Sequence, residues 1–224
     1  MSVLLSARVL GRRRSDRQGW LLRGVSVEVH AGDRVAVTGS SGAGKTLLLR
    51  ALSLLDPIDE GEVLWNDRPI SNRQVNAFRS QIVYLHQRPS LPEGSVEDVL
   101  RSPFLLLVHR QQQFDRDRLL DWLTALGRDA RFLTKWSGDL SGGEAQIVAL
   151  LRAMQLDPAV LLLDEPTAAM DATTRQAAQR LVEDWVAEAA DRRATVWVSH
   201  DPAQADRAAQ RVIKLGDGQL VEEI

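Results

Sequence analysis

The chain has 224 residues, of which 44% are hydrophobic and 26% charged, and its formal net charge is −2. This length fits a single domain with a substantial core, and the balanced composition argues against intrinsic disorder and against nucleic acid or an anionic lipid surface as a partner. The chain contains no cysteine, which excludes disulfides, thiolate metal sites and cysteine nucleophiles.

Six short apolar runs predict strands, and helical patterns lie between them. The runs are rich in β-branched residues, and several are apolar on both sides, as is typical of a covered parallel sheet. The predicted strands span 25–29, 34–38, 82–85, 160–163, 195–198 and 211–215. The predicted helices between them span 45–54, 142–154 and 174–190. This alternation predicts an α/β domain, which a hairpin around Gly216-Asp217-Gly218 closes between strands at 212–215 and 219–221.

The stretch 88–155 differs from the rest of the chain in its residue pattern. Prolines interrupt its first part, and a helical pattern follows at 116–126. Ser95, followed by acidic residues in the next turn, predicts a helix N-cap. We therefore expect a helical subdomain inserted into a core that is formed by residues 1–87 and 156–224.

Residues 39–46 read GSSGAGKT and lie between a predicted strand and a predicted helix, which is the context of a phosphate-binding loop. Its glycines let the backbone curl, so that successive N–H groups face the phosphates of a nucleotide. Lys45 adds positive charge, and Thr46 places a hydroxyl where nucleotide-bound Mg²⁺ needs an oxygen ligand. The candidate nucleotide-binding residues of this loop are Gly39, Ser40, Ser41, Gly42, Ala43, Gly44, Lys45 and Thr46.

Two adjacent carboxylates, Asp164 and Glu165, follow the apolar strand at 160–163. Polar residues often end a strand, so these two carboxylates alone would not indicate a functional site. The phosphate-binding loop in the same chain is the reason to assign them one. Beside that loop, Asp164 can orient Mg²⁺ through its water shell, and Glu165 can accept a proton from a water that attacks the γ-phosphate. The two neighbours are thus expected to have different roles.

The sequence LSGGE at 140–144 opens a predicted helix. A serine N-cap followed by glycines would be ordinary in isolation. Gly142 and Gly143 nevertheless weaken the start of a helix, which favours a close approach of backbone N–H groups to an anion. Ser141, Gly142 and Gly143 are therefore further candidates for phosphate binding.

In their order along the chain, these motifs resemble those of the ATP-binding subunit of ABC transporters, and the resemblance covers nearly the whole chain. It rests on GSSGAGKT, Gln87 after a strand, LSGGE, LLLDEPT at 161–167, Asp171 and His200. It implies one domain, 1–224, with the α/β P-loop NTPase core of an ABC-type ATPase, an antiparallel β subdomain and an inserted α-helical subdomain. It also implies ATP hydrolysis, with ATP and Mg²⁺ as cofactors.

The resemblance further implies a role for each site residue. Ser141, Gly142 and Gly143 would contact the γ-phosphate of an ATP bound to the loop of a second copy, so hydrolysis would require a dimer. Gln87 would touch Mg²⁺ and the attacking water, and His200 would act as a γ-phosphate switch. The implied catalytic residues are Glu165, His200, Gln87 and Lys45, and the implied metal-binding residues are Thr46, Gln87 and Asp164.

The sequence departs from the family pattern at two places. The family commonly stacks an N-terminal aromatic ring on adenine, but residues 9–14 contain none, and Trp20 lies close to the next predicted strand. We therefore expect an arginine among residues 12–14 to stack on the base and the base selectivity to be loose. Ile147 follows Gln146 where the family usually has arginine, so a supporting ion pair behind this helix is not expected.

The transporter itself would need a separate membrane protein. No apolar run reaches the roughly 18 residues that cross a bilayer, and the N-terminus has no signal-peptide core. We therefore expect the chain in the cytoplasm, on the cytoplasmic face of the inner or plasma membrane. By resemblance, a cytoplasmic helix of the permease docks at Arg88 to about Phe104, the second ATPase subunit is a copy of this chain, and the most similar subunits serve iron or metal export.

Three other protein classes share part of the pattern. A soluble ABC-type ATPase, such as that of an iron–sulfur cluster scaffold, keeps every motif without a membrane partner, so this alternative stays open. DNA-repair ABC ATPases insert long coiled coils, whereas Leu140 follows Thr46 by only 94 positions, without heptads. A nucleotide kinase or GTPase would have the loop but no use for LSGGE.

Overall fold

The computed structural model describes residues 2–16, 18–199 and 209–223. Its central sheet is made of β3 (Arg34–Thr38), β6 (Ile82–Leu85), β7 (Val160–Asp164), β8 (Ala194–Val198), β9 (Arg211–Gly216) and β10 (Gln219–Glu223). The strand order is β10-β9-β3-β8-β7-β6. Neighbouring strands from β9 to β6 pair in parallel, whereas β10 pairs antiparallel with β9 at the edge. The parallel strands therefore direct their carboxyl ends to the same edge of the sheet.

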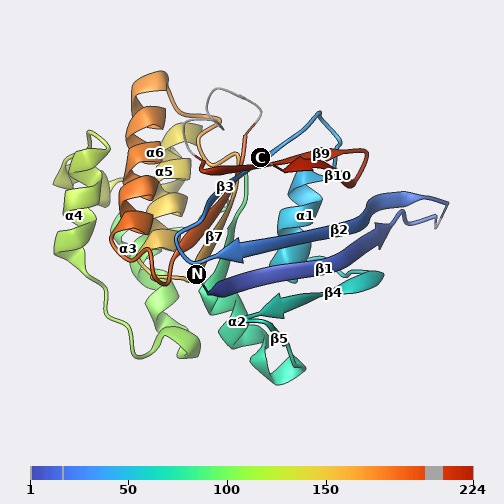
Figure 1. Cartoon of the computed structure of the whole chain (residues 1–224). Coiled ribbons are helices and arrows are strands. Elements are labelled where there is room, and N and C mark those ends of the chain that lie inside the picture. Colours follow the sequence, from blue (N-terminus) through green and yellow to red (C-terminus); the bar gives the residue numbers. More distant parts are fainter. Residues whose placement is uncertain (1, 17, 200–208, 224) are drawn as a thin grey trace.

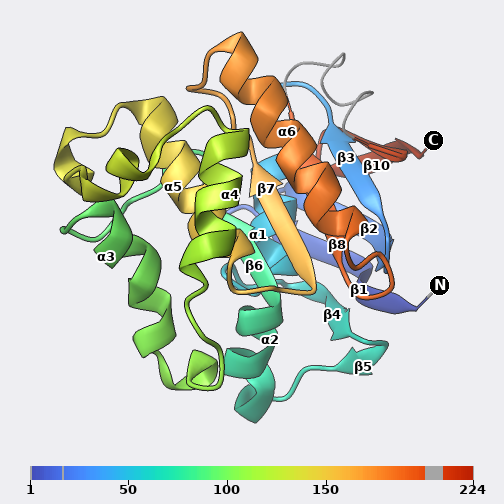
Figure 2. The same ribbon diagram turned by 90° about the vertical axis from the view of Figure 1, so that its left-hand side faces the viewer.

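A second, antiparallel sheet lies on the opposite side of the molecule from most of the helices (Figure 1). It contains β1 (Val3–Arg13), β2 (Trp20–His30), β4 (Glu60–Trp65) and β5 (Arg68–Pro69), in the order β2-β1-β4-β5. The helices are α1 (Lys45–Leu52), α2 (Val75–Gln81), α3 (Val96–Arg101), α4 (Arg116–Ala125), α5 (Gly142–Met154) and α6 (Ala172–Ala187). Figure 2 shows α3, α4 and α5 together at one end of the molecule.

Strand β7 separates two apolar cores because its side chains alternate between the faces of the central sheet. Val160 and Leu162 belong to the core that contains α1 and the antiparallel sheet. Leu161 and Leu163 belong to the core that contains residues of α3, α4, α5 and α6. All four side chains are fully buried, which explains why this strand is apolar without interruption.

The predicted α/β class is confirmed, with an antiparallel sheet and a group of helices beside the parallel sheet. Ser95 caps α3 as predicted, because its hydroxyl accepts a hydrogen bond from the Asp98 N–H at 3.1 Å. Sequence analysis missed β1, β4, β5 and α2, and it placed the start of β2 too late. Among the described residues, no helix combines the length and the apolar character that a membrane crossing requires.

Candidate nucleotide-binding site

The predicted phosphate-binding loop connects β3 to α1 at the carboxyl edge of the central sheet. Gly39 has φ 141°, and a Cβ atom there would lie 2.2 Å from the Leu215 carbonyl oxygen. Gly44 has φ 98° and directly precedes α1, where a Cβ atom would lie 2.9 Å from the Leu22 side chain. Both positions therefore require glycine, for backbone conformation and for space.

Lys45 is 5% exposed and folds back over the loop. Its ammonium group donates hydrogen bonds to the carbonyl oxygens of Gly39 at 2.8 Å and Ser40 at 2.9 Å. Burial lowers the pKa of Lys45 below its ordinary value, and the carboxylates of Glu165 and Asp164 act in the opposite direction. The loop thus encloses one cation whose neighbouring negative charges are the two predicted acidic residues.

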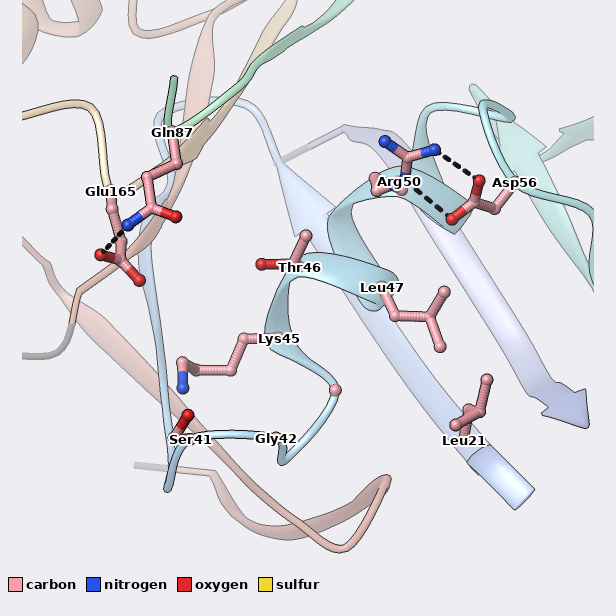
Figure 3. Close-up of a pocket in the computed structure, with 11 residues that line it drawn as sticks. Leu21, Ser41, Gly42, Lys45, Thr46, Leu47, Arg50, Asp56, Gln87 and Glu165 are labelled. Atoms are coloured by element: carbon pink, nitrogen blue, oxygen red, sulfur yellow. Dashed lines mark hydrogen bonds and ion pairs between the residues drawn. The ribbon is translucent and has the colours of Figure 1, made fainter. Parts of the chain in front are cut away.

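A cavity of about 490 Å³ opens in front of this loop. In Figure 3, Gln87 and Glu165 lie on one side, Lys45 and Thr46 in the middle, and Arg50 with Asp56 on the other side. The lining residues are Leu21, Ser41, Gly42, Gly44, Lys45, Thr46, Leu47, Arg50, Asp56, Gln87 and Glu165. The structure thereby brings together loop, amide and carboxylate from three separate parts of the sequence, in a cavity of the size that suits a small-molecule ligand.

Glu165 and Gln87 are in direct contact on one side of this cavity, since the Gln87 amide donates to the Glu165 carboxylate at 2.8 Å. Glu165 lies just beyond β7 with φ 48°, a left-handed conformation that is uncommon for a residue other than glycine. Its backbone N–H donates to the Val198 carbonyl at 3.1 Å, which ties this turn to β8. Backbone strain of this kind clusters at functional sites, and here it directs the predicted base.

Sequence analysis missed the supporting role of Gln146, which is 2% exposed. Its amide donates to the carbonyl oxygens of Gln87 at 3.0 Å and Glu165 at 3.3 Å, and its oxygen accepts from the Ala169 N–H at 2.9 Å. One side chain from α5 thus holds the backbones of two of the predicted catalytic residues, Gln87 and Glu165. The only sign of this role in the sequence was a glutamine beside the apolar residues of the predicted helix.

Asp164 is 2% exposed, and its two oxygen atoms differ in their surroundings. The Tyr84 hydroxyl donates to Oδ2 at 2.9 Å, whereas Oδ1 is buried without a hydrogen-bond partner among the described residues. Burial raises the pKa of Tyr84 far above its ordinary value, and the charge of Asp164 raises it further, so the phenol stays protonated and donates.

The residues predicted for Mg²⁺ fit the chemistry of this ion. Magnesium takes oxygen ligands and keeps several waters, and the buried Oδ1 of Asp164 needs a donor such as one of those waters. The Thr46 hydroxyl and the Gln87 amide oxygen line the same cavity as the Glu165 carboxylate. Asp164 is buried and does not itself line the cavity. Thr46, Gln87 and Asp164 are the residues that would hold the ion.

Ser141, Gly142 and Gly143 lie at the start of α5 and do not line the cavity. The Ser141 hydroxyl accepts from the Glu144 N–H at 3.3 Å, and the Ser141 N–H donates to the Glu144 carboxylate at 3.0 Å. A Cβ atom at Gly143 would lie 2.8 Å from the Ala169 carbonyl, so close backbone packing already requires that glycine. The structure does not bring this segment to the phosphate-binding loop of its own chain.

The other predicted residues have simpler surroundings. Asp171 caps α6 by accepting from the Thr174 N–H at 2.9 Å, so this helix begins at Ala172, before the predicted start. Ile147 is fully buried in an apolar core, where an ion pair has no place. His200 lies outside the described residues.

Two of the three arginines expected to stack on the base, Arg12 and Arg13, are engaged outside the cavity. Arg12 lies 3.4 Å from the Asp59 carboxylate, and Arg13 lies 3.2 Å from that of Glu60. The Arg13 guanidinium also lies over the Trp20 ring, 4.1 Å from its centroid. Residues 12–14 do not line the cavity, so the expected stacking finds no support in the structure. The apolar residues that line the cavity are Leu21 of β2 and Leu47 of α1.

Comparisons with known proteins agree with this geometry. The ABC transporter family model matches residues 22–168. ABC transporter I family member 17 of Arabidopsis thaliana is 35% identical over 94% of this chain and 78% of its own length. The probable iron export ATP-binding protein FetA of Escherichia coli (strain K12) is 32% identical over 96% and 92%, respectively. A solved dimeric ATP-binding cassette with bound ADP and Pi superposes with a TM-score of 0.86 at 25% identity, covering 99% of this chain and 98% of that one. The chain therefore belongs to the ABC transporter family and is one of its ATPase subunits.

Proposed function

We propose that two copies of this chain close around two ATP molecules and that hydrolysis of these molecules powers a separate membrane permease. The observation that carries the proposal is the cavity in which Lys45 and Thr46 face the hydrogen-bonded pair of Gln87 and Glu165. The dimeric form of the solved relative with ADP and Pi supports the assembly. Ser141 lies at the start of α5, away from the cavity of its own chain. This position supports a site in which Ser141 of one copy completes the cavity of the other.

In the proposed mechanism, the protein positions the reactants and compensates charge. The loop N–H groups and Lys45 hold the phosphates of ATP, and the Glu165 carboxylate accepts the proton of the attacking water. Gln87 holds Glu165 and orients that water. Bound Mg²⁺ would neutralise negative charge on the phosphates. Ser141 of the second copy would cap the γ-phosphate, so that closure of the dimer completes the site.

Lys45→Ala tests the phosphate-binding loop. The variant is expected to bind ATP more weakly by about 1.5–3 kcal/mol, because a charge-assisted hydrogen bond to phosphate is lost. Equilibrium binding of ATP measures the effect. Lys214→Ala is the matched control, since Lys214 is an exposed lysine of β9 that lies 3.9 Å from Glu222. Equal ATP affinities of wild type and Lys45→Ala would place the nucleotide elsewhere.

The permease is proposed to dock in a groove between β6 and α5. Pro89, Leu91 and Pro103, from the predicted docking stretch 88–104, line this groove. Leu106 also lines it and is 56% exposed, within the exposed apolar run 105–108. The groove suits an apolar helical segment of a membrane partner.

Leu106→Asp tests this docking surface. The substitution is expected to weaken association with the membrane fraction by about 2 kcal/mol, because an apolar contact is replaced by a charge. ATP hydrolysis by the isolated protein should remain unchanged. Val221→Asp is the control, because Val221 is 62% exposed on β10, at a distance from the groove in sequence and fold. Full membrane association of Leu106→Asp would exclude this groove.

For the cargo, we propose metal export, on the resemblance to the probable iron exporter of Escherichia coli, of which the chain covers 92%. Other relatives are named for the import of aliphatic sulfonates, at 34% identity, or for the transport of histidine, lysine, arginine and ornithine, at 30% identity. Identification of the membrane protein that co-purifies with the chain tests the cargo. A chain that stays outside the membrane fraction and joins a soluble assembly would favour the scaffold alternative.

A further inference from the structure

Tyr84 and Asp164 face the same side of the central sheet from neighbouring strands. In the parallel register of β6 and β7, Tyr84 lies opposite Leu162, and Asp164 follows two residues later. Side chains two residues apart on a strand share a face, and a long side chain reaches its diagonal neighbour. The register therefore brings the phenol to the carboxylate, and the hydroxyl lies 2.9 Å from Oδ2.

The hydroxyl of Tyr84 directs its proton to Asp164. An ionised carboxylate only accepts hydrogen bonds, whereas a phenol can donate one. The hydrogen bond from the Tyr84 hydroxyl to Oδ2 of Asp164 therefore uses the phenol proton and one of the two carboxylate oxygens.

This arrangement distinguishes the two oxygens of Asp164. A carboxylate without partners can turn about its last bond, because that torsion is broad and two-fold. Here Oδ2 is occupied by Tyr84, while Oδ1 is buried and has no partner among the described residues. The carboxylate thus presents one fixed acceptor.

We propose that Tyr84 is a positioning residue for Asp164, whose hydroxyl fixes Oδ2 so that Oδ1 faces the Mg²⁺ that accompanies the nucleotide. This inference rests on the nucleotide site proposed above. Groups that orient a metal-binding side chain typically change metal affinity by about 10- to 100-fold when they are removed. Tyr84 should act in the same way on the Mg²⁺-dependent part of nucleotide binding.

The test is the affinity of Tyr84→Phe for a non-hydrolysable ATP analogue, measured in EDTA and in Mg²⁺. Phenylalanine keeps the ring and removes only the hydroxyl. The affinity in EDTA should stay within about twofold of wild type, whereas the gain in affinity on adding Mg²⁺ should fall by about 10-fold or more. Thr195→Val is the control, since it removes a buried hydroxyl from β8 in register with Leu161, on the other face of the sheet.

Tyr84 also provides a direct spectroscopic readout, because it is the only tyrosine of the chain. A protein labelled with ¹³C at tyrosine Cζ gives a single resonance. Addition of Mg²⁺ to the analogue-bound protein should shift that resonance, and the absence of a shift would overturn the inference.

The binding experiment separates this inference from the proposed function. An unchanged Mg²⁺-dependent gain in Tyr84→Phe overturns the inference alone. An equal loss of affinity in EDTA and in Mg²⁺ also overturns it, because Tyr84 would then support the fold rather than the metal-binding carboxylate. A wild-type protein without any gain from Mg²⁺ overturns the proposed metal site and the inference together.

Discussion

Replacing Glu165 with glutamine is expected to slow ATP hydrolysis by roughly 10²- to 10⁴-fold, which is the usual effect of losing a general base. Glutamine has the same shape and can still accept the hydrogen bond that Gln87 donates at 2.8 Å. Its amide cannot take a proton from water. Phosphate release in a single turnover measures the chemical step without contribution from product release.

The binding of ATP separates a catalytic role for Glu165 from a structural one. Glu165→Gln should bind ATP as tightly as wild type, because the loop and Lys45 are the groups proposed to hold the phosphates. Glu183→Gln is the matched control, since it removes a carboxylate of α6 that lies 3.7 Å from Arg34. The control should hydrolyse ATP at the wild-type rate. Wild-type turnover in Glu165→Gln would assign the base to another group.

The parts of this site that the sequence predicts are those encoded by local spacing. The loop at 39–46 and the pair of Asp164 and Glu165 each lie within a few consecutive residues. Glycine, lysine and hydroxyl must follow one another there because one turn of backbone makes the site. Such motifs are visible without any knowledge of strand order.

The contacts that sequence analysis missed depend on pairing between distant segments. Tyr84 and Asp164 are 80 positions apart, and Gln146 and Gln87 are 59 apart. Only the order of strands in the central sheet and the position of α5 bring them together. A tyrosine at the end of a strand or a glutamine in a helix carries no separate signal of such a contact.

The missed elements have irregular or short patterns. Strand β1 does not alternate, because register shifts interrupt its pairing with β2, and Val9 has φ 51°. A strand with such irregularities loses the two-residue period by which strands are recognised. Helix α2 has seven residues and only Phe78 is buried, so it shows no apolar stripe. The framework of the site could thus be predicted only in its regular parts.

Ser141→Arg is expected to reduce ATP hydrolysis by roughly 10²-fold or more, because the proposed site loses a phosphate-capping group supplied by the second copy. Ser141 is exposed at the start of α5 and lies outside the cavity of its own chain. A long cationic side chain there would occupy the space in which the partner's loop is expected. ATP binding by the single chain should persist. Turnover and the oligomeric state in ATP measure the two effects.

Loss of the helix cap alone must be excluded as the cause. Serine caps contribute about 1 kcal/mol to helix stability, so Ser71→Arg serves as the control. Ser71 is exposed and forms the same kind of capping arrangement with Gln74, far from α5 in the sequence. This variant should retain wild-type turnover, and both variants should be folded by circular dichroism.

Mixing Ser141→Arg with Lys45→Ala distinguishes a shared site from two independent ones. In a mixed dimer, one composite site contains both substitutions, whereas the other combines an intact loop with an intact Ser141. A mixed dimer therefore regains at most one composite site, so random pairing of equal amounts should restore at most about one quarter of the wild-type activity. Full activity of Ser141→Arg alone as a monomer would contradict a site that is built from two copies of this chain.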